Sequence, residues 1–303
     1  MRKIRKGDIV GRLSYGKDIV FVVERIVKTN NNKEFAILKG LTIRIQADSP
    51  VEDLELFNVK QVEEHVRNFE EKVAKRIENY EKSLKKSYFS REKMIVYTGK
   101  ILHIDGDKKY AEKSRRYYRK VGLNAIVRNI PERRQPFAIS ILLQRYTPDV
   151  LVITGHDGMI RKGTKFNDLY NYRNSKYFIK TVEEARKQSL PKDLVIFAGA
   201  CQSYYEGLMI AGANFASSPA RILIDFMDPL IVAEKVAITT EERFVTIHDI
   251  ENELRDGQRG ISRNWWARQK ENYDDLKMNT CFFHEFFYKF MYIRCWIWII
   301  RKF

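Results

Sequence analysis

Cysteine is scarce in this chain of 303 residues. Of its three cysteines, Cys281 and Cys295 lie near the C-terminal end of the sequence, so Cys201 is the single thiol of the preceding body. This scarcity excludes a disulfide scaffold for the body, and the absence of CxxC or paired Cys/His spacing argues against a zinc site. We expect the protein to need neither a metal nor an organic cofactor.

Long apolar runs are missing as well. The first residues, MRKIRKGDIVGRLSYG, lack the hydrophobic stretch of a secretory signal, which predicts a cytosolic protein. The aromatic tail, residues 276–303, is interrupted by Glu285, Lys289 and Arg294, so it lacks the ~18 to 20 apolar residues of a membrane span. Two interpretations of the tail stay open: an interfacial anchor, or a terminal stretch of unknown role.

Acidic residues are outnumbered by basic ones. The chain contains 55 Lys and Arg against 39 Asp and Glu, a formal charge of +16. This balance favours acidic partners, such as nucleic acid, anionic lipid or acidic proteins, without selecting among them. A hydrophobic share of 44% is enough for a sizeable core, so we expect a folded chain.

The first 92 residues divide into two parts. Residues 1–57 contain short β-rich runs separated by turn residues, which predicts a small SH3-like β-barrel that acts as a docking domain. Residues 58–92 contain apolar side chains at every third or fourth position, which predicts a helical connector at 59–87. The strands expected in the barrel are 8–13, 19–27, 34–38 and 43–45.

Residues 93–275 alternate between apolar runs and helical patterns. This alternation predicts an α/β domain with a mostly parallel sheet flanked by helices. The expected strands are 94–104, 124–128, 150–154, 194–198 and 222–226, and the expected helices are 108–121, 136–146, 181–188 and 204–213. Because ligands bind beyond the carboxyl ends of parallel strands, the residues that follow each strand are the candidates for chemistry.

Two of these strand ends carry a nucleophile and a base. His156 follows the run DVLVITG, and Cys201 follows the run LVIFAGA, so we expect both side chains at one edge of the sheet. A cysteine needs a nearby base because the thiolate is the nucleophile. Each residue alone also fits a bland interpretation, Cys201 as a small buried hydrophobe and His156 as a residue that orders a turn. Their joint arrangement favours a catalytic pair.

Acyl transfer also needs donors for the developing oxyanion. The backbone amides of Gly158 and Cys201 are the candidates, because a glycine lets the chain approach a substrate closely. The separation of His156 and Cys201, 201 − 156 = 45 residues, is near the roughly 50 residues found in caspases.

The motifs VITGHDG and VIFAGACQS resemble the two motifs of caspase-like and clostripain-like peptidases. More extensively, the body from Arg5 to about Tyr273 resembles the YabG family of sporulation peptidases, notably in HIDGD, RYTPDVLVITGHDG, FAGACQSYYEGLMIAGANFASSPARILIDFMDP and GQRGISRNWW. One departure from the caspase motif is Asp157, which separates His156 from Gly158, the candidate oxyanion donor.

This resemblance implies a caspase-like α/β fold and a cysteine endopeptidase with Cys201 as nucleophile and His156 as general acid and base. It implies cleavage after arginine or other basic residues in proteins of the assembling spore coat. It also implies a place in the mother-cell cytoplasm in association with the coat. If arginine is preferred, the basic runs of this chain are themselves candidate self-cleavage sites.

A pocket for arginine needs a carboxylate, since the guanidinium is always charged. Asp225 and Asp228, in LIDFMDP, are our candidates, although an Asp at such a position more often shapes a turn. For Asp105 and Asp107 the same two interpretations stay open, a carboxylate that binds arginine or a residue that shapes a turn.

A non-enzymatic function is the competing hypothesis. In it, a basic α/β protein binds nucleic acid or coat proteins through the N-terminal barrel. The runs KKYAEKSRRYYRK and PERRQP combine charge and aromatics, as nucleic-acid contacts do, but a solvated helix face accounts for them equally. No RNP-like motif is present, and we favour protein partners over nucleic acid.

Overall fold

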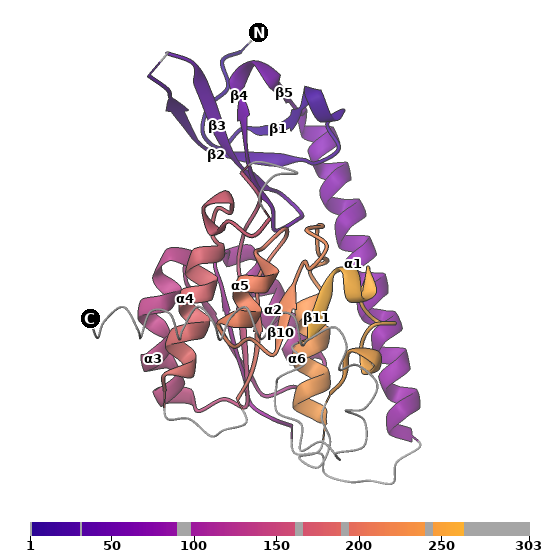
Figure 1. Cartoon of the computed structure of the whole chain (residues 1–303). Coiled ribbons are helices and arrows are strands. Elements are labelled where there is room, and N and C mark those ends of the chain that lie inside the picture. The colour runs from indigo at the N-terminus through magenta and orange to yellow at the C-terminus, as the bar shows by residue number, and fades with distance from the viewer. Residues whose placement is uncertain are drawn as a thin grey trace, which may run out of the picture. The chain divides into compact units, whose positions relative to one another are not determined.

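The computed structural model describes residues 2–30, 32–89, 98–160, 166–188, 194–239 and 245–263, which belong to one compact unit, Met1–Asn264. Within α1 the side chains at 76, 80, 81 and 83–89 are not described. The predictions for the aromatic tail, 276–303, fall outside the described residues. The unit contains two sheets and a long helix (Figure 1).

The N-terminal sheet is antiparallel, with the strand order β4-β3-β2-β1-β5. Its strands are β1 (Ile9–Arg12), β2 (Phe21–Lys28), β3 (Glu34–Gly40), β4 (Gln46–Pro50) and β5 (Leu54–Leu56). Alternating residues of these strands, among them Phe21, Val23, Ala36 and Leu38, form its core, as the period of a half-buried strand requires. The sheet agrees with the predicted β-rich region, whereas its SH3-like character stays a prediction.

The sequence prediction differs from this sheet at two strands. The predicted strand at 43–45 is wrong, because β4 begins at Gln46 and Ile45 forms only a single bridge, to Asp157. Ile43 and Ile45 are apolar because this loop packs against the core of the N-terminal sheet. The strand β5 was missed because its run is short and contains Glu55.

The predicted connector is the helix α1 (Val59–Phe89). Its apolar stripe, at Phe69, Val73 and Ile77, packs on the core of the second sheet, and Lys113 Nζ lies 4.5 Å from the Phe69 ring centre. The stripe is buried because the period of the helix puts these residues on one face.

The second sheet has six strands in the order β11-β10-β9-β8-β6-β7, all parallel except β11. Its strands are β6 (Ile101–Asp105), β7 (Ala125–Asn129), β8 (Val150–Thr154), β9 (Val195–Ala198), β10 (Phe215–Ser217) and β11 (Ile261–Arg263), and its helices are α2 (Lys108–Lys120), α3 (Gln135–Tyr146), α4 (Ser175–Arg186), α5 (Tyr205–Ile210) and α6 (Asp228–Ile238). Short 3₁₀ helices occur at Leu13–Tyr15, Val51–Asp53, Glu132–Arg134, Leu169–Asn171, Ile247–Asp249 and Gly257–Arg259.

Helices cover both faces of this sheet (Figure 1). Alternate residues of β8 illustrate the division: Val150 and Val152 pack with α2 and α6, whereas Leu151 and Ile153 pack with α3, α4 and α5. A strand that is buried on both faces reads as a continuous apolar run, which is why the parallel sheet was predictable.

The predicted strand at 222–226 is wrong. The chain there is irregular, and the strand that follows β9 in the sheet is β10, only three residues long. Ile224 and Phe226 are nevertheless buried, so their apolar character reflects a loop that packs inward rather than a strand. The left-handed backbone at Ser218 and Arg221 takes the chain out of the sheet. Of the predicted strand at 94–104, the described part is a strand from Ile101.

Candidate active site

The carboxyl ends of β8 and β9 bring His156 and Cys201 to the same edge of the sheet. In the parallel pairing of these neighbouring strands, Ile153 is opposite Ala198. His156 and Cys201 each lie three residues beyond that paired position. The expected shared edge therefore follows from the register of the two strands.

Cys201 lies in a loop that a glycine shapes. Gly199 has a φ of +114°, and a Cβ there would lie 2.4 Å from Ser217 Oγ, so a side chain is excluded on both grounds. The Cys201 side chain is fully buried and packs with Ile45 of the N-terminal region and with Ile224. Its Sγ accepts a hydrogen bond from the Ile224 main-chain N–H, with an N···S distance of 3.4 Å.

Burial raises the pKa of Cys201 to about 12. The Ile224 amide and the positive charge of Arg44 oppose this rise but do not cancel it. Cys201 is therefore a neutral thiol at pH 7 in this conformation.

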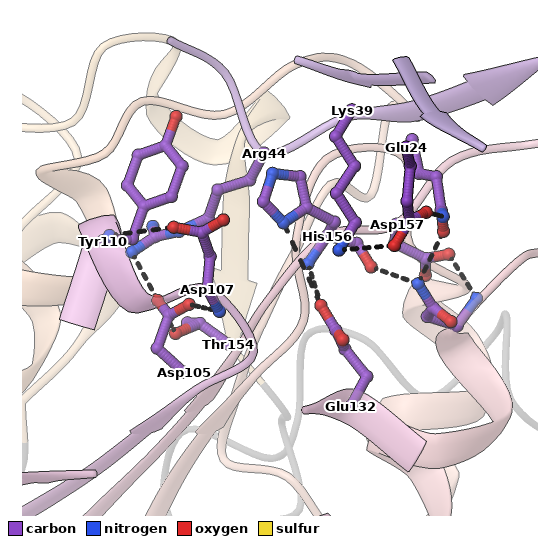
Figure 2. Close-up of polar contacts among 12 residues, drawn as sticks. Glu24, Lys39, Arg44, Asp105, Asp107, Tyr110, Glu132, Thr154, His156 and Asp157 are labelled. Atoms are coloured by element: carbon purple, nitrogen blue, oxygen red, sulfur yellow. Dashed lines mark hydrogen bonds and ion pairs between the residues drawn. The ribbon is translucent and has the colours of Figure 1, made fainter. Parts of the chain in front are cut away.

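His156 is buried beside Glu132 (Figure 2). Its main-chain N–H donates to Glu132 Oε1 at 2.8 Å, and its Nδ1 lies 4.0 Å from the same oxygen. The Tyr110 ring meets the imidazole edge to face, with 5.8 Å between ring centres. Neither ring nitrogen has a hydrogen-bond partner among the described residues.

Burial lowers the pKa of His156, and Asp107 and Glu132 only partly offset this effect. The charge of Lys39, on β3, lowers it further. The imidazole is therefore neutral at pH 7, which is the form that can accept a proton from a thiol.

Asp157 ties together the two loops that carry the pair. Its Oδ1 accepts hydrogen bonds from the amides of Gly158 at 2.9 Å and Asn174 at 2.8 Å. Its Oδ2 accepts from the hydroxyls of Ser175 and Ser203. Because Ser203 lies two residues after Cys201, a single carboxylate fixes the His156 loop, the start of α4 and the Cys201 loop. Burial raises the pKa of Asp157 to about 6 despite these hydrogen bonds.

Asp105, at the end of β6, is the centre of a second buried network. Arg44 Nη2 donates to its Oδ2 at 2.9 Å, and Thr154 Oγ1 donates to the same oxygen at 2.8 Å. His103 Nε2 is 2.7 Å from Thr154 Oγ1, and Tyr118 Oη is 3.1 Å from His103 Nδ1. Burial lowers the pKa of His103 to about 3, so this histidine is neutral and orders its neighbours. Figure 2 shows Arg44 reaching from the N-terminal region toward Asp105.

The two predicted oxyanion donors differ in their surroundings. The Gly158 amide already donates to Asp157, and a Cβ at Gly158 would lie 2.2 Å from the main-chain oxygen of Gln46. This glycine therefore permits the close contact between the His156 loop and the N-terminal region. An oxyanion role for Gly158, and for the Cys201 amide, stays a prediction.

Asp225 and Asp228 shape the chain at the start of α6. Asp228 is buried and accepts hydrogen bonds from the amides of Asp225 and Arg255, and Asp225 Oδ1 accepts from the Met227 amide. Burial opposes the charge of Arg255, but Asp256, Asp225 and Asp228 together raise its pKa. A basic side chain thus already lies near both carboxylates, and their role in specificity stays a prediction.

Sequence reasoning missed Arg44, Tyr110 and Glu132 as members of the site. Arg44 had a signal, since it stands between Ile43 and Ile45 in an otherwise apolar run, where a buried charge needs a partner. Glu132 and Tyr110 lie on the surface-like segments PERRQP and KKYAEKSRRYYRK, and nothing in their neighbours distinguishes them.

We expect the Cys201 thiol to react slowly with iodoacetamide at pH 7, since with a pKa about 12 only about 10⁻⁵ of it is thiolate. The rate should rise about tenfold per pH unit from pH 7 to 10, because deprotonation limits it. Peptide mapping by mass spectrometry distinguishes Cys201 from Cys281 and Cys295, and the protein in guanidinium is the control. A rate that levels off near pH 7 would contradict the buried thiol.

Among the described residues, no group of three or more His, Cys, Asp or Glu is placed to hold a metal ion. No helix in the described ranges has the length and apolar character needed to cross a membrane.

Comparison with known proteins agrees with the peptidase interpretation. A family model described as YabG peptidase U57 matches residues 5–263. The Sporulation-specific protease YabG of Bacillus subtilis (strain 168) is 36% identical over 271 residues, covering 84% of this chain and 92% of that relative. No solved structure matches the chain. The chain therefore belongs to the YabG peptidase U57 family and is a peptidase.

Proposed function

We propose that this peptidase is a cysteine endopeptidase in which Cys201 is the nucleophile and His156 the general acid and base. The observation that supports this most is the matched position of the two residues, each three residues beyond a paired position on neighbouring parallel strands. The hydrogen bonds of Asp157 to both loops add support, because they fix the two loops relative to each other.

In the proposed reaction His156 takes the proton of the Cys201 thiol, and the sulfur forms a bond to the scissile carbonyl carbon. The carbonyl π pair moves to the oxygen, which becomes an oxyanion. Collapse of this intermediate breaks the C–N bond, and the leaving amine takes the proton from His156. A water molecule then gives a proton to His156 and its oxygen forms a bond to the thioester carbon. Collapse of the second intermediate breaks the C–S bond and frees the acid product, and the Cys201 sulfur takes the proton back from His156.

Cleavage requires the covering residues to move. Cys201 and His156 are both buried. The segment 44–46 holds the His156 loop through hydrogen bonds from Asp157 N to Arg44 O at 3.3 Å and from Gln46 N to Asp157 O at 2.8 Å. The described conformation is thus a resting form, and displacing this segment would expose the pair and let their proton transfer begin.

The substrates we propose are sporulation proteins, in particular precursors of the spore coat, cut after arginine or another basic residue. The support is the family and the relative's name, Sporulation-specific protease. On this proposal the enzyme works in the cytoplasm of the mother cell, associates with the coat and also cleaves itself at basic sites. It uses no cofactor.

Matched peptides test the specificity. We expect a peptide taken from a basic region to be cleaved at its arginine, and the same peptide with glutamine in that position to remain intact. The reason is that a carboxylate pocket discriminates a guanidinium from an uncharged amide. Cleavage sites are read by mass spectrometry, with a lysine peptide to show whether charge alone is enough. Equal cleavage of the arginine and glutamine peptides would refute the basic specificity.

A further inference from the structure

The oxyanion of the proposed reaction needs a hydrogen-bond donor that has no other acceptor in the resting enzyme. Such a donor stabilises charge only as it develops, which is how an oxyanion site accelerates acyl transfer. The Gly158 amide does not meet this requirement in the described conformation, because Asp157 accepts its hydrogen bond. A donor without an acceptor must therefore come from another residue near the pair.

Tyr110, in the first turn of α2, meets this requirement. The residue is buried, and its hydroxyl has no hydrogen-bond partner in the described part of the chain. The two other buried tyrosines of the same helix differ: the Tyr118 hydroxyl bonds to His103, and the Tyr117 hydroxyl donates to Glu234. A buried hydroxyl without a partner destabilises a fold, so its presence beside a candidate active site points to an acceptor that arrives later.

The Tyr110 ring contacts both His156 and the segment that follows Ile224, the residue bonded to the Cys201 sulfur. On one side its ring contacts the His156 imidazole, with 5.8 Å between centres. On another side it contacts Phe226 at 5.8 Å, two residues after Ile224, whose amide binds the Cys201 sulfur. Figure 2 shows Tyr110, Arg44 and His156 on neighbouring segments of the site.

Arg44 adds positive charge at the same place. Its guanidinium carbon lies 4.5 Å from the centre of the Tyr110 ring, and its Nε and Nη1 have no hydrogen-bond partner in the described ranges. Burial raises the pKa of Tyr110 well above its usual value. The charge of Arg44 opposes this rise without cancelling it, so the hydroxyl stays protonated and can donate. These are the properties of a group that binds a developing negative charge.

Resting on the function proposed above, we propose that the Tyr110 hydroxyl donates a hydrogen bond to the carbonyl oxygen of the peptide bond that is cleaved. When sulfur bonds to the carbonyl carbon and the π pair moves to the oxygen, the hydrogen bond to Tyr110 strengthens. No proton leaves the tyrosine. When the intermediate collapses, the pair returns to the carbonyl and the hydrogen bond weakens again.

The test replaces Tyr110 by phenylalanine, which removes only the hydroxyl. Loss of one oxyanion donor lowers kcat by about 10² to 10³, so we expect a fall in this range for the arginine peptide with KM little changed. A peptide aldehyde that ends in arginine should bind more weakly by a similar factor, because its adduct with Cys201 carries the same oxyanion. The unfolding temperature should not fall, since the hydroxyl has no partner to lose.

The control is Tyr118→Phe, which removes a hydroxyl bound to His103 and should lower the unfolding temperature while kcat stays within a few-fold of wild type. A Tyr110→Phe enzyme with wild-type kcat, beside an inactive Cys201→Ala enzyme, would overturn the role of Tyr110 and leave the proposed function standing. Full activity of Cys201→Ala would instead overturn the proposed function and this inference with it.

Discussion

Replacing Cys201 by alanine is expected to abolish cleavage of the arginine peptide while the protein remains folded. The thiol supplies the bond to the acyl group, and no other described cysteine can replace it. Replacing His156 by alanine should lower the rate by about 10² to 10⁴, the usual contribution of a positioned acid and base. Steady-state cleavage followed by mass spectrometry measures both effects.

The fold should survive both substitutions. Cys201 makes weak sulfur hydrogen bonds, with the main chain of Ile224 and of Arg44, and the ring nitrogens of His156 have no hydrogen-bond partner among the described residues. Circular dichroism checks this expectation. His248→Ala is the matched control, since the His248 side chain is exposed and its ring bonds to Glu251, so its loss should leave the rate unchanged. Wild-type cleavage by a folded Cys201→Ala protein would show that the active site lies elsewhere.

The second large effect is expected at Asp157, where alanine should lower the free energy of unfolding by about 3 kcal/mol or more. The substitution leaves four donors without their acceptor, namely the amides of Gly158 and Asn174 and the hydroxyls of Ser175 and Ser203. Because these donors lie in three different segments, the loops of His156 and Cys201 should also lose their alignment, and activity should fall with stability. Urea denaturation measures the change.

Asp157→Asn is the matched variant, because it keeps an oxygen acceptor for the two amides, and we expect it to lose less stability than alanine. It also isolates a pH effect. The folded pKa of Asp157 is raised from 3.8 to about 6, so its contribution to stability is greatest below pH 3.8 and is lost as the pH rises through 6. The loss is about 3 kcal/mol, at about 1.4 kcal/mol per pH unit.

We therefore expect the stability of wild type relative to Asp157→Asn to decline between pH 4 and 7. If the difference in free energy of unfolding between wild type and Asp157→Asn stayed constant from pH 4 to pH 7, the raised pKa of Asp157 would be refuted. Equal stability of wild type and Asp157→Ala would refute the role of this carboxylate in holding the loops.

The parallel sheet and the edge that carries His156 and Cys201 could be predicted from the sequence. The strand β8, which is buried on both faces, is apolar over its first four residues, and its end is marked by the glycines on either side of His156. The same signal misled at 222–226, because a buried loop and a buried strand have the same apolar composition. Local sequence does not say which main-chain groups will be paired.

The partners of the site could not be predicted for another physical reason. Glu132 reaches the His156 amide from a 3₁₀ helix, and Arg44 reaches Asp105 from the N-terminal region, 61 residues earlier. Contacts between such distant residues depend on how whole elements pack, and the hydrophobic periodicity of a single segment does not indicate them. Asp157 illustrates a related case: the sequence marks it as a departure from the caspase motif, whereas the hydrogen bonds that join three segments through its carboxylate are evident only in the fold.

The ion pair of Arg44 and Asp105 means that the N-terminal sheet of one family member should not simply replace that of another. Both side chains are buried, 2% and 0% exposed, at the meeting of the two regions. A catalytic sheet separated from its N-terminal region would have a bare carboxylate at the end of a central strand, and burial of an unpaired charge is strongly destabilising. A chimaera of family members would have to inherit residues 42–46 and the end of β6 from the same parent.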